Sequence, residues 1–269
     1  MIDFKKIAQS TDRYNFHSHT QFCDGRATMA RFAEAVSAAG FRHWGFSPHS
    51  PVPVESPCNM KSECMDAYLA EMKRLNTLYG DKVRFYSALE IDYLGPHWGP
   101  SNPYFNALPL DYRIGSIHFI PTKRGEAVDV DGSVEGFKQK LESKFGGDIE
   151  YVVNTFYDQT LDMIAAGGFD IIGHFDKISH NASQCRPGIE HEAWYEKRLN
   201  EVFDAIIASG VVVEINTKSR ARFGRFFPHE RLWGRLKNAG VTLIVNSDAH
   251  HLELIDASRS EALEMLRNV

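Results

Sequence analysis

The 269-residue chain lacks the features that mark several large classes of protein. No basic run stands out and the net charge is −5, so the composition gives no indication of a nucleic acid polymer as a partner. No apolar run approaches the length of a membrane span, and the first residues contain no apolar segment typical of a signal peptide. The four cysteines are scattered and form no C-x-x-C pair. We therefore expect reduced thiols, a cytoplasmic protein and no membrane partner.

Nucleotide-binding fingerprints and linkers are also missing. The sequence contains neither G-x-G-x-x-G nor the P-loop pattern, which argues against a doubly wound nucleotide-binding sheet. It contains no linker rich in Gly, Ser or Pro, no internal repeat and no low-complexity tract. The simplest expectation is a single domain spanning residues 1–269.

Short apolar runs alternate with segments of helical spacing along the whole chain. We expect seven strands, at residues 14–16, 43–46, 83–89, 112–117, 169–173, 211–215 and 241–245. Helical patterns occur at residues 28–39, 62–79, 133–146, 149–166, 189–209, 228–239 and 252–267. Strand–helix alternation with short connections predicts a parallel sheet with right-handed crossovers. Seven such units favour an α/β fold of the (β/α)7 barrel type, and an open doubly wound sheet is the alternative.

The polar residues that follow the predicted strands point to one site. In a β/α barrel the functional residues lie at the carboxyl ends of the strands. The stretch YNFHSHTQFCDG places His17 and His19 one residue apart, so both side chains leave a strand on the same side. Six of the seven strand ends offer His, Asp or Glu, among them His17, His19, His49, Glu90, Asp92, His118, His174, Asp248 and His250. Burying so many of these groups in one barrel mouth is costly unless they bind something.

Imidazoles combined with carboxylates, without a thiolate, form a ligand set that suits Zn, Mn or Fe. A single buried histidine is more often a core residue held by hydrogen bonds than a ligand, but this explanation is poor for the whole set. Nine plausible ligands are too many for one tetrahedral ion, so we expect two to three divalent metal ions.

The ordered strings H-x-H-T-x-x-x-D-G, P-H-S, L-E, G-S-I-H, G-H-F-D and S-D-A-H resemble the polymerase and histidinol phosphatase (PHP) superfamily over residues 17–250. The phrases EIDY, IGSIHF, GHFDK and EINT are most similar to its histidinol-phosphatase branch. The resemblance implies a distorted seven-stranded TIM-like barrel with a trinuclear metal centre. It also implies the ligands of that centre: His17, His19 and Asp248 for one ion, Glu90 as a bridge to a second ion held by His118 and His174, and Asp24, His49 and His250 for a third ion.

The same resemblance implies hydrolysis of a small phosphorylated substrate, specifically L-histidinol phosphate to L-histidinol and phosphate in histidine biosynthesis. The implied reaction is attack by a metal-bridging hydroxide, with Asp248 and His250 helping to move protons. A phosphate also needs cationic side chains, and we expect Lys177, Arg220 and Arg222 to supply them. His97, in a loop rich in Pro and Gly, is a further candidate for a substrate contact.

Three alternatives remain open. A phosphoesterase of this superfamily acting on nucleotides or other small phosphoesters has the same ligands, and so does a non-catalytic metal-binding barrel. The string DVDGS, residues 129–133, resembles the nucleophile motif of haloacid-dehalogenase phosphatases, but the charged run TKRGEAV stands where that motif requires an apolar strand. A loop whose Asp and Ser cap the next helix explains the string more simply.

The sequence also suggests residues 51–59 as a wall or lid of the site, and it does not indicate the oligomeric state.

Overall fold

The computed structural model describes residues 2–269 and contains one seven-stranded sheet. Its strands are β1 (Tyr14–Asn15), β2 (His43–Phe46), β3 (Arg84–Asp92), β4 (Tyr112–Ser116), β7 (Ile171–Ile172), β8 (Val212–Asn216) and β9 (Leu243–Asn246). Neighbours pair in parallel in the order β1-β2-β3-β4-β7-β8-β9. The prediction of a seven-stranded α/β barrel is confirmed, and the predicted strands differ from the observed ones only at their ends.

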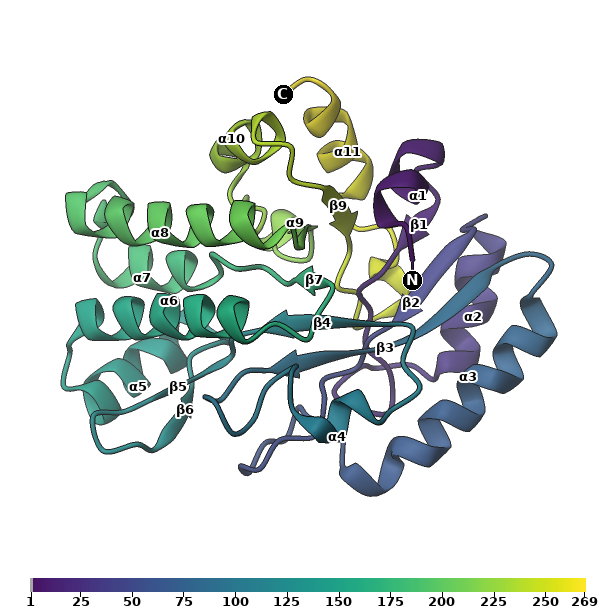
Figure 1. Ribbon diagram of the computed structural model, residues 1–269, viewed down its shortest axis with the longest axis horizontal. Helices are drawn as coiled ribbons and strands as arrows, with labels where there is room; N and C mark the ends of the chain where they lie inside the picture. Colours follow the sequence, from purple (N-terminus) through teal and green to yellow (C-terminus); the bar gives the residue numbers. More distant parts are fainter. Residues whose placement is uncertain (1) are drawn as a thin grey trace.

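Helices cover the outside of the sheet (Figure 1). They are α1 (Phe4–Ser10), α2 (Met29–Ala38), α3 (Met65–Tyr79), α4 (Pro103–Asn106), α5 (Val134–Phe145), α6 (Ile149–Ala166), α7 (Ile178–Cys185), α8 (Ala193–Ser209), α9 (Arg220–Phe223), α10 (Trp233–Asn238) and α11 (Arg259–Arg267). Every predicted helical pattern contains one of these helices, although several patterns begin with a 3-10 turn. The sequence analysis missed α1, α4, α7 and α9, and it missed an antiparallel hairpin formed by β5 (Phe119–Pro121) and β6 (Ala127–Asp129).

Polar caps fix where the longer helices begin. The side chain of Thr28 accepts a hydrogen bond from the backbone of Arg31 at the start of α2. Asp148 does the same for Tyr151 at the start of α6. These caps satisfy amide groups that have no partner within the first turn of a helix. Gly210 ends α8 with a φ of 69°, a left-handed conformation that glycine adopts without strain.

Alternate positions along the strands change from apolar to polar in the direction of the chain. The series is Tyr86, Ala88, Glu90 and Asp92 along β3, and Tyr112, Ile114, Ser116 and His118 along and beyond β4. The first two residues of each series belong to one buried apolar cluster, whereas the last two are buried polar residues. Since side chains two residues apart share a face, the barrel interior has an apolar end and a polar end. We call the apolar end the lower end, and the polar end, at the carboxyl ends of the strands, the upper end.

The barrel closes between its first and last strands. One parallel backbone bridge joins Ser18 to Ala249. Beside it, the side chain of Asn246 accepts a hydrogen bond from the backbone of Phe16 at 2.8 Å. Side-chain hydrogen bonds therefore supplement the short backbone contact at this seam between β1 and β9.

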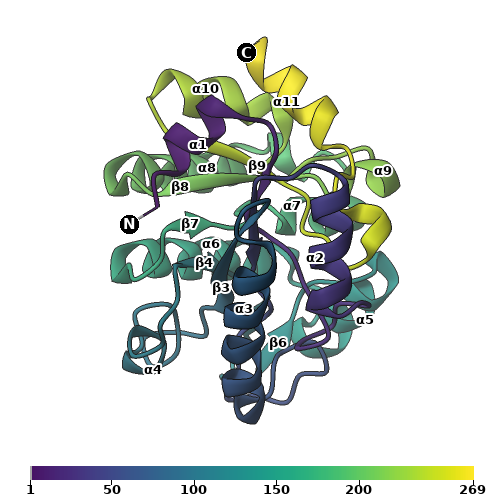
Figure 2. The same ribbon diagram turned by 90° about the vertical axis from the view of Figure 1, so that its right-hand side faces the viewer.

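Helix α1, near the N-terminus, packs against the apolar lower end of the barrel, and α11 lies close to it (Figure 2). Phe4 of α1 packs edge-on against Phe16 and Tyr112, with ring centroids 4.9 and 5.5 Å apart. Arg259 of α11 is buried and donates a hydrogen bond to the backbone carbonyl of Asp12 at 3.2 Å.

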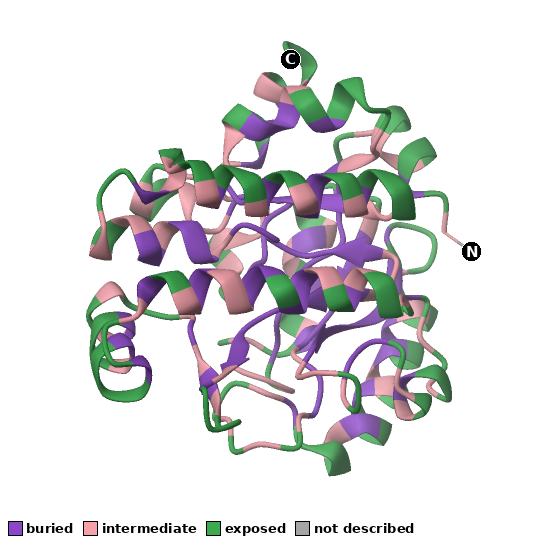
Figure 3. Ribbon diagram, turned by 60° about the vertical axis from the view of Figure 1, so that its left-hand side comes forward, coloured by how far each residue is buried: buried purple, intermediate pink, exposed green. Residues whose placement is uncertain are grey.

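The distribution of buried residues matches the arrangement of strands inside and helices outside (Figure 3). The strands are almost wholly buried, and the outer helices alternate buried and exposed positions along their length. Within residues 2–269, no helix is both long and apolar enough to cross a membrane.

Candidate metal centre

All nine predicted ligands lie together at the upper end of the barrel. A cavity of about 310 Å³ opens there, and its lining includes Asp24, His49, Glu90, His118, His174, Asp248 and His250. His17 and His19 lie beside this set and are fully buried. The structure thus brings together residues that are spread over most of the chain.

The first group joins the two ends of the barrel sheet. His17 and His19, which follow β1, have their Nε2 atoms 3.1 Å apart. The Nε2 atom of His19 lies 3.1 Å from Oδ1 of Asp248, which follows β9. These three residues have ligand atoms close enough together to hold one metal ion.

Glu90 of β3 stands between this group and a second one. Its Oε2 atom lies 3.2 Å from Nε2 of His17, and its Oε1 atom lies 2.9 Å from Nε2 of His174. His118 approaches the same Oε1 atom at 3.6 Å, so Glu90, His118 and His174 form a second group that could hold an ion. The two oxygens of one carboxylate therefore face two groups, which is the geometry a bridging ligand needs.

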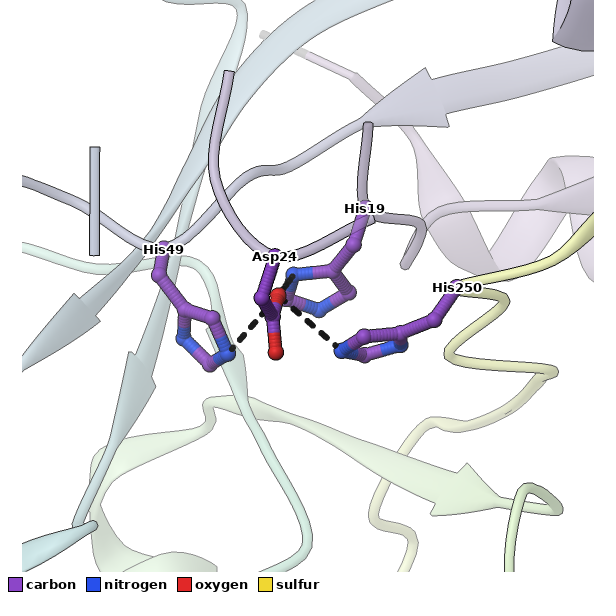
Figure 4. Close-up of side chains that lie close together, drawn as sticks. All are labelled: His19, Asp24, His49 and His250. Carbon is purple, nitrogen blue, oxygen red and sulfur yellow. Dashed lines mark ion pairs between the residues drawn. The ribbon is translucent and has the colours of Figure 1, made fainter. Parts of the chain in front are cut away.

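The third group surrounds Asp24 (Figure 4). Its Oδ1 atom lies 3.3 Å from Nε2 of His250, 3.7 Å from Nδ1 of His19 and 3.9 Å from Nε2 of His49. The sequence analysis assigned Asp24, His49 and His250 to one ion, and the structure adds His19 to the residues around it. His19 faces the first group through Nε2 and this group through Nδ1.

Several buried atoms in this region lack a hydrogen-bond partner among residues 2–269. They are Oδ1 of Asp24, Nδ1 of His49, Nε2 of His118 and Oδ1 of Asp248. A buried polar atom without a partner is costly, and converging nitrogen and oxygen atoms without thiolates are ligands of Zn, Mn or Fe. The residues present therefore fit divalent metal ions.

Backbone strain is concentrated at two of these residues. His174 has a φ of 21° and Asp248 a φ of 49°, in a region that non-glycine residues rarely adopt. Such conformations persist when the surrounding structure enforces them, and they are common at functional sites. Both residues follow short barrel strands and turn their side chains toward the cavity.

Two further carboxylates hold the histidines in place: Asp92, which the sequence analysis named at a strand end without a role, and Glu214, which it did not name. Nδ1 of His17 donates to Oε1 of Glu214 at 2.7 Å, and Nδ1 of His118 donates to Oδ1 of Asp92 at 2.7 Å. Each bond leaves Nε2 of the histidine free to bind a metal ion. Glu214 is a charged residue inside an apolar strand, and Asp92 lies two positions after Glu90 on the same strand face, so both carried a signal in the sequence.

Close packing of these charges shifts several pKa values. Burial opposes the charge of Glu90, but His17, His118 and His49 hold the pKa of this carboxyl well below its usual range. Burial lowers the pKa of His118, while Asp92 and Glu90 together raise it to about 9. Because metal ions bind the neutral imidazole, metal binding here must displace protons and weakens as the pH falls.

Lys177 and Lys218 are the cationic side chains that the described structure places in the cavity lining. Nζ of Lys218 lies 3.2 Å from Nε2 of His250 and 3.5 Å from Oδ2 of Asp248. Nζ of Lys177 donates to Oδ2 of Asp131 at 2.6 Å. Lys177 was predicted from the sequence, whereas Lys218 was missed in favour of two arginines that follow it.

Among residues 2–269, those that line the cavity do not include His97, Arg220 or Arg222. Arg220 begins α9, turns outward and donates from Nε to Glu261 at 3.0 Å. Arg222 is exposed on the same short helix, with its guanidinium over the ring of Phe223. His97 is exposed in the loop after β3. The predicted substrate contacts of these three residues therefore have no support in the structure.

The string DVDGS begins at Asp129, the last residue of β6 in the hairpin, and continues to the start of α5, so it does not follow a strand of the barrel sheet. Ser133 caps α5 by accepting a hydrogen bond from Gly136, as expected. Asp129 does not cap the helix, because its side chain bonds the backbone of Asp131 and pairs with Lys140 at 3.0 Å. Both aspartates line the cavity, as do residues 55–59 of the segment predicted to form a wall.

A family comparison matches residues 15–218 to the PHP domain. The chain belongs to the PHP domain family. This PHP domain protein is 24% identical over 263 residues to a "Probable histidinol-phosphatase" of Deinococcus radiodurans, covering 94% of this chain and 92% of that protein. It is also 24% identical over 257 residues to a protein of the same name from Schizosaccharomyces pombe, covering 87% of this chain and 79% of that protein.

Solved structures share the fold of this PHP domain protein. The hisK structure from Listeria monocytogenes has a TM-score of 0.81 at 15% identity and covers 92% of this chain and 99% of its own. The histidinol phosphate phosphatase of Lactococcus lactis, in complex with zinc, L-histidinol and phosphate, has a TM-score of 0.72 at 17% identity and covers 96% of this chain and 93% of its own. Both likenesses confirm the barrel architecture.

Proposed function

We propose that this PHP domain protein is a metal-dependent phosphomonoesterase that hydrolyses L-histidinol phosphate to L-histidinol and phosphate. The observation that carries the proposal is the convergence of nine His, Asp and Glu side chains at one end of the barrel, seven of them lining a cavity that Lys177 and Lys218 also line. The names of the two curated relatives, which this chain matches over most of their length, support the choice of substrate.

The ligand groups assign roles to the residues. His17, His19 and Asp248 form one binding set, Glu90, His118 and His174 a second set, and Asp24, His49 and His250 a third. When bound there, divalent ions neutralise phosphoryl oxygens and increase the acidity of water. Zinc in the Lactococcus lactis structure supports zinc as one of the ions that this set accepts.

The two lysines supply the charge that a phosphate group requires. Each ends in a compact ammonium group that suits a phosphoryl oxygen as a point charge. The ammonium group of Lys218 is a proton donor, and it lies beside two acceptors that line the cavity, Nε2 of His250 and Oδ2 of Asp248. We assign Asp248 and His250 to proton movement at the leaving oxygen in addition to their roles as ligands.

The test is phosphate release from L-histidinol phosphate by protein reconstituted with zinc or manganese. The comparison panel contains nucleoside monophosphates and other small phosphomonoesters. We expect kcat/KM for L-histidinol phosphate to exceed that for every other ester, and we expect a chelator to abolish activity. The His174→Ala variant should lose at least about a hundredfold in kcat/KM, since it removes a ligand, while the exposed control His191→Ala should keep its activity. Equal, weak activity on all esters would contradict the substrate, and full activity with a chelator would contradict the metal-dependent mechanism.

A further inference from the structure

The residues that line the cavity fall into two sets, which we call the inner region and the outer wall. The inner region holds the proposed metal ligands together with Lys177 and Lys218. The outer wall holds three further carboxylates, those of Glu55, Asp129 and Asp131, which belong to none of the ligand groups. Metal ions in the inner region would offset its carboxylates, but they would leave the charge of the outer wall in place.

Asp131 is the outer carboxylate closest to the inner region, because it is paired with Lys177. Their side chains are 2.6 Å apart and 35% and 17% exposed, respectively. Lys177 also lies near enough to Asp248 and Glu90 for all three carboxylates to raise its pKa against the effect of burial. The ammonium group of Lys177 therefore sits between the metal ligands and the outer wall.

Buried polar atoms indicate which end of a bound phosphate ester lies deeper in the cavity. Nε2 of His118 and Oδ1 of Asp248 line the cavity without a hydrogen-bond partner among residues 2–269, and these residues are only 6% and 2% exposed. Such atoms mark the end at which metal ions and a phosphate group meet. The alcohol part of a bound phosphate ester then extends toward the outer wall, where it meets carboxylates.

We propose that Asp131, with Glu55 and Asp129 beside it, is a specificity residue that binds a positively charged group on the alcohol part of the substrate. The proposal rests on the proposed function, whose substrate carries an amino group on its alcohol part, and it assigns that group to Asp131. The phosphate of such a substrate takes Lys177 as its partner, and the ammonium group replaces Lys177 at Asp131. An ester with an anionic alcohol part is repelled by the same wall.

The experiment compares L-histidinol phosphate with an analogue that lacks only the amino group, using zinc-reconstituted protein. In Asp131→Asn we expect kcat/KM for the amine-bearing ester to fall about fivefold, as befits a partly exposed charge pair. We expect kcat/KM for the analogue to stay constant or rise, because Lys177 is released from its competing partner. The matched control is Glu126→Gln, which removes an exposed carboxylate paired with Lys144 outside this cavity and should change neither value.

A second variant separates specificity from the placement of Lys177. Glu55 is exposed on the wall, and Glu55→Gln should lower kcat/KM for the amine-bearing ester by about twofold and leave that for the analogue unchanged. Equal losses on both esters in Asp131→Asn would show that Asp131 only positions Lys177, and an unchanged ratio in both variants would also overturn the proposal. Wild-type protein that hydrolyses neither ester would refute the proposed function, and the specificity proposal with it.

Discussion

Replacing Glu214 by glutamine tests whether a buried carboxylate holds the metal ligands in their binding form. Glu214 is fully buried and accepts four hydrogen bonds. Its Oε1 atom accepts from Nδ1 of His17 at 2.7 Å and from Asn246 at 3.0 Å. Its Oε2 atom accepts from the backbone of His174 and from the side chain of Asn216, both at 3.2 Å.

The expected cost follows from this geometry. A glutamine side chain has one oxygen and one NH2 group, so one of the two donor pairs must face an NH2 group whichever way the amide turns. A buried donor that loses its acceptor costs about 1–3 kcal/mol, so we expect the free energy of unfolding to fall by about 2–4 kcal/mol. If the NH2 group faces His17, the ring must accept at Nδ1 and carry its proton on Nε2, which then cannot bind a metal ion. Zinc affinity should therefore fall about 10- to 100-fold.

Two measurements on Glu214→Gln check these numbers. Thermal unfolding of metal-free protein should show a melting temperature about 4–8 °C below that of the wild type. Competition with a coloured zinc chelator should report the weaker affinity. The control Glu150→Gln removes an exposed carboxylate paired with Arg186 and should alter neither quantity appreciably. Wild-type stability and zinc affinity in Glu214→Gln would refute the orienting role of this carboxylate.

Three further predictions concern the cavity and the barrel seam. Lys218→Met should weaken inhibition by inorganic phosphate about tenfold without changing the amount of zinc bound, and unchanged inhibition would exclude Lys218 as a phosphate ligand. N-ethylmaleimide should modify the exposed Cys58 and lower activity, because Cys58 lines the cavity and the adduct would occupy part of it. A Cys58→Ser variant that the reagent inactivates equally fast would contradict this placement. Burial raises the pKa of the Cys58 thiol, so its modification should be slower than that of free cysteine at neutral pH and accelerate as the pH rises toward 9. Arg259→Met should lower the free energy of unfolding by about 3 kcal/mol, since it leaves the buried backbone carbonyls of Tyr14 and Val245 without this donor. A chemical denaturation midpoint equal to that of wild type would show that these contacts are dispensable.

The sequence predicted the barrel and eight of the nine candidate ligands because each of these signals is local, whereas Asp24 was assigned through the family resemblance. A strand end is visible as an apolar run that stops at His, Asp or Glu, and parallel strands bring all such ends to one side. His17, Glu90 and Asp248 could be placed at the same site for this reason alone. Pairwise distances and the exact grouping around His19 required the structure, because they depend on how the strands tilt and close.

The substrate-facing residues were harder to predict, because they depend on the paths of loops. Lys218, Arg220 and Arg222 have similar side chains within five positions, but α9 begins at Arg220 and carries both arginines away from the cavity. Asp131 lies two residues after an unpredicted hairpin, and it lines the cavity together with Asp129, the last residue of that hairpin. No periodic pattern in the sequence predicts that hairpin.

The seam between β1 and β9 links metal occupancy to the dynamics of the barrel. Within residues 2–269, its direct backbone pairing is the single bridge between Ser18 and Ala249, and the ligand group His17, His19 and Asp248 spans it. An ion held by that group would act as a crosslink between the two ends of the sheet. Loading the site should therefore slow amide hydrogen exchange most strongly around this junction.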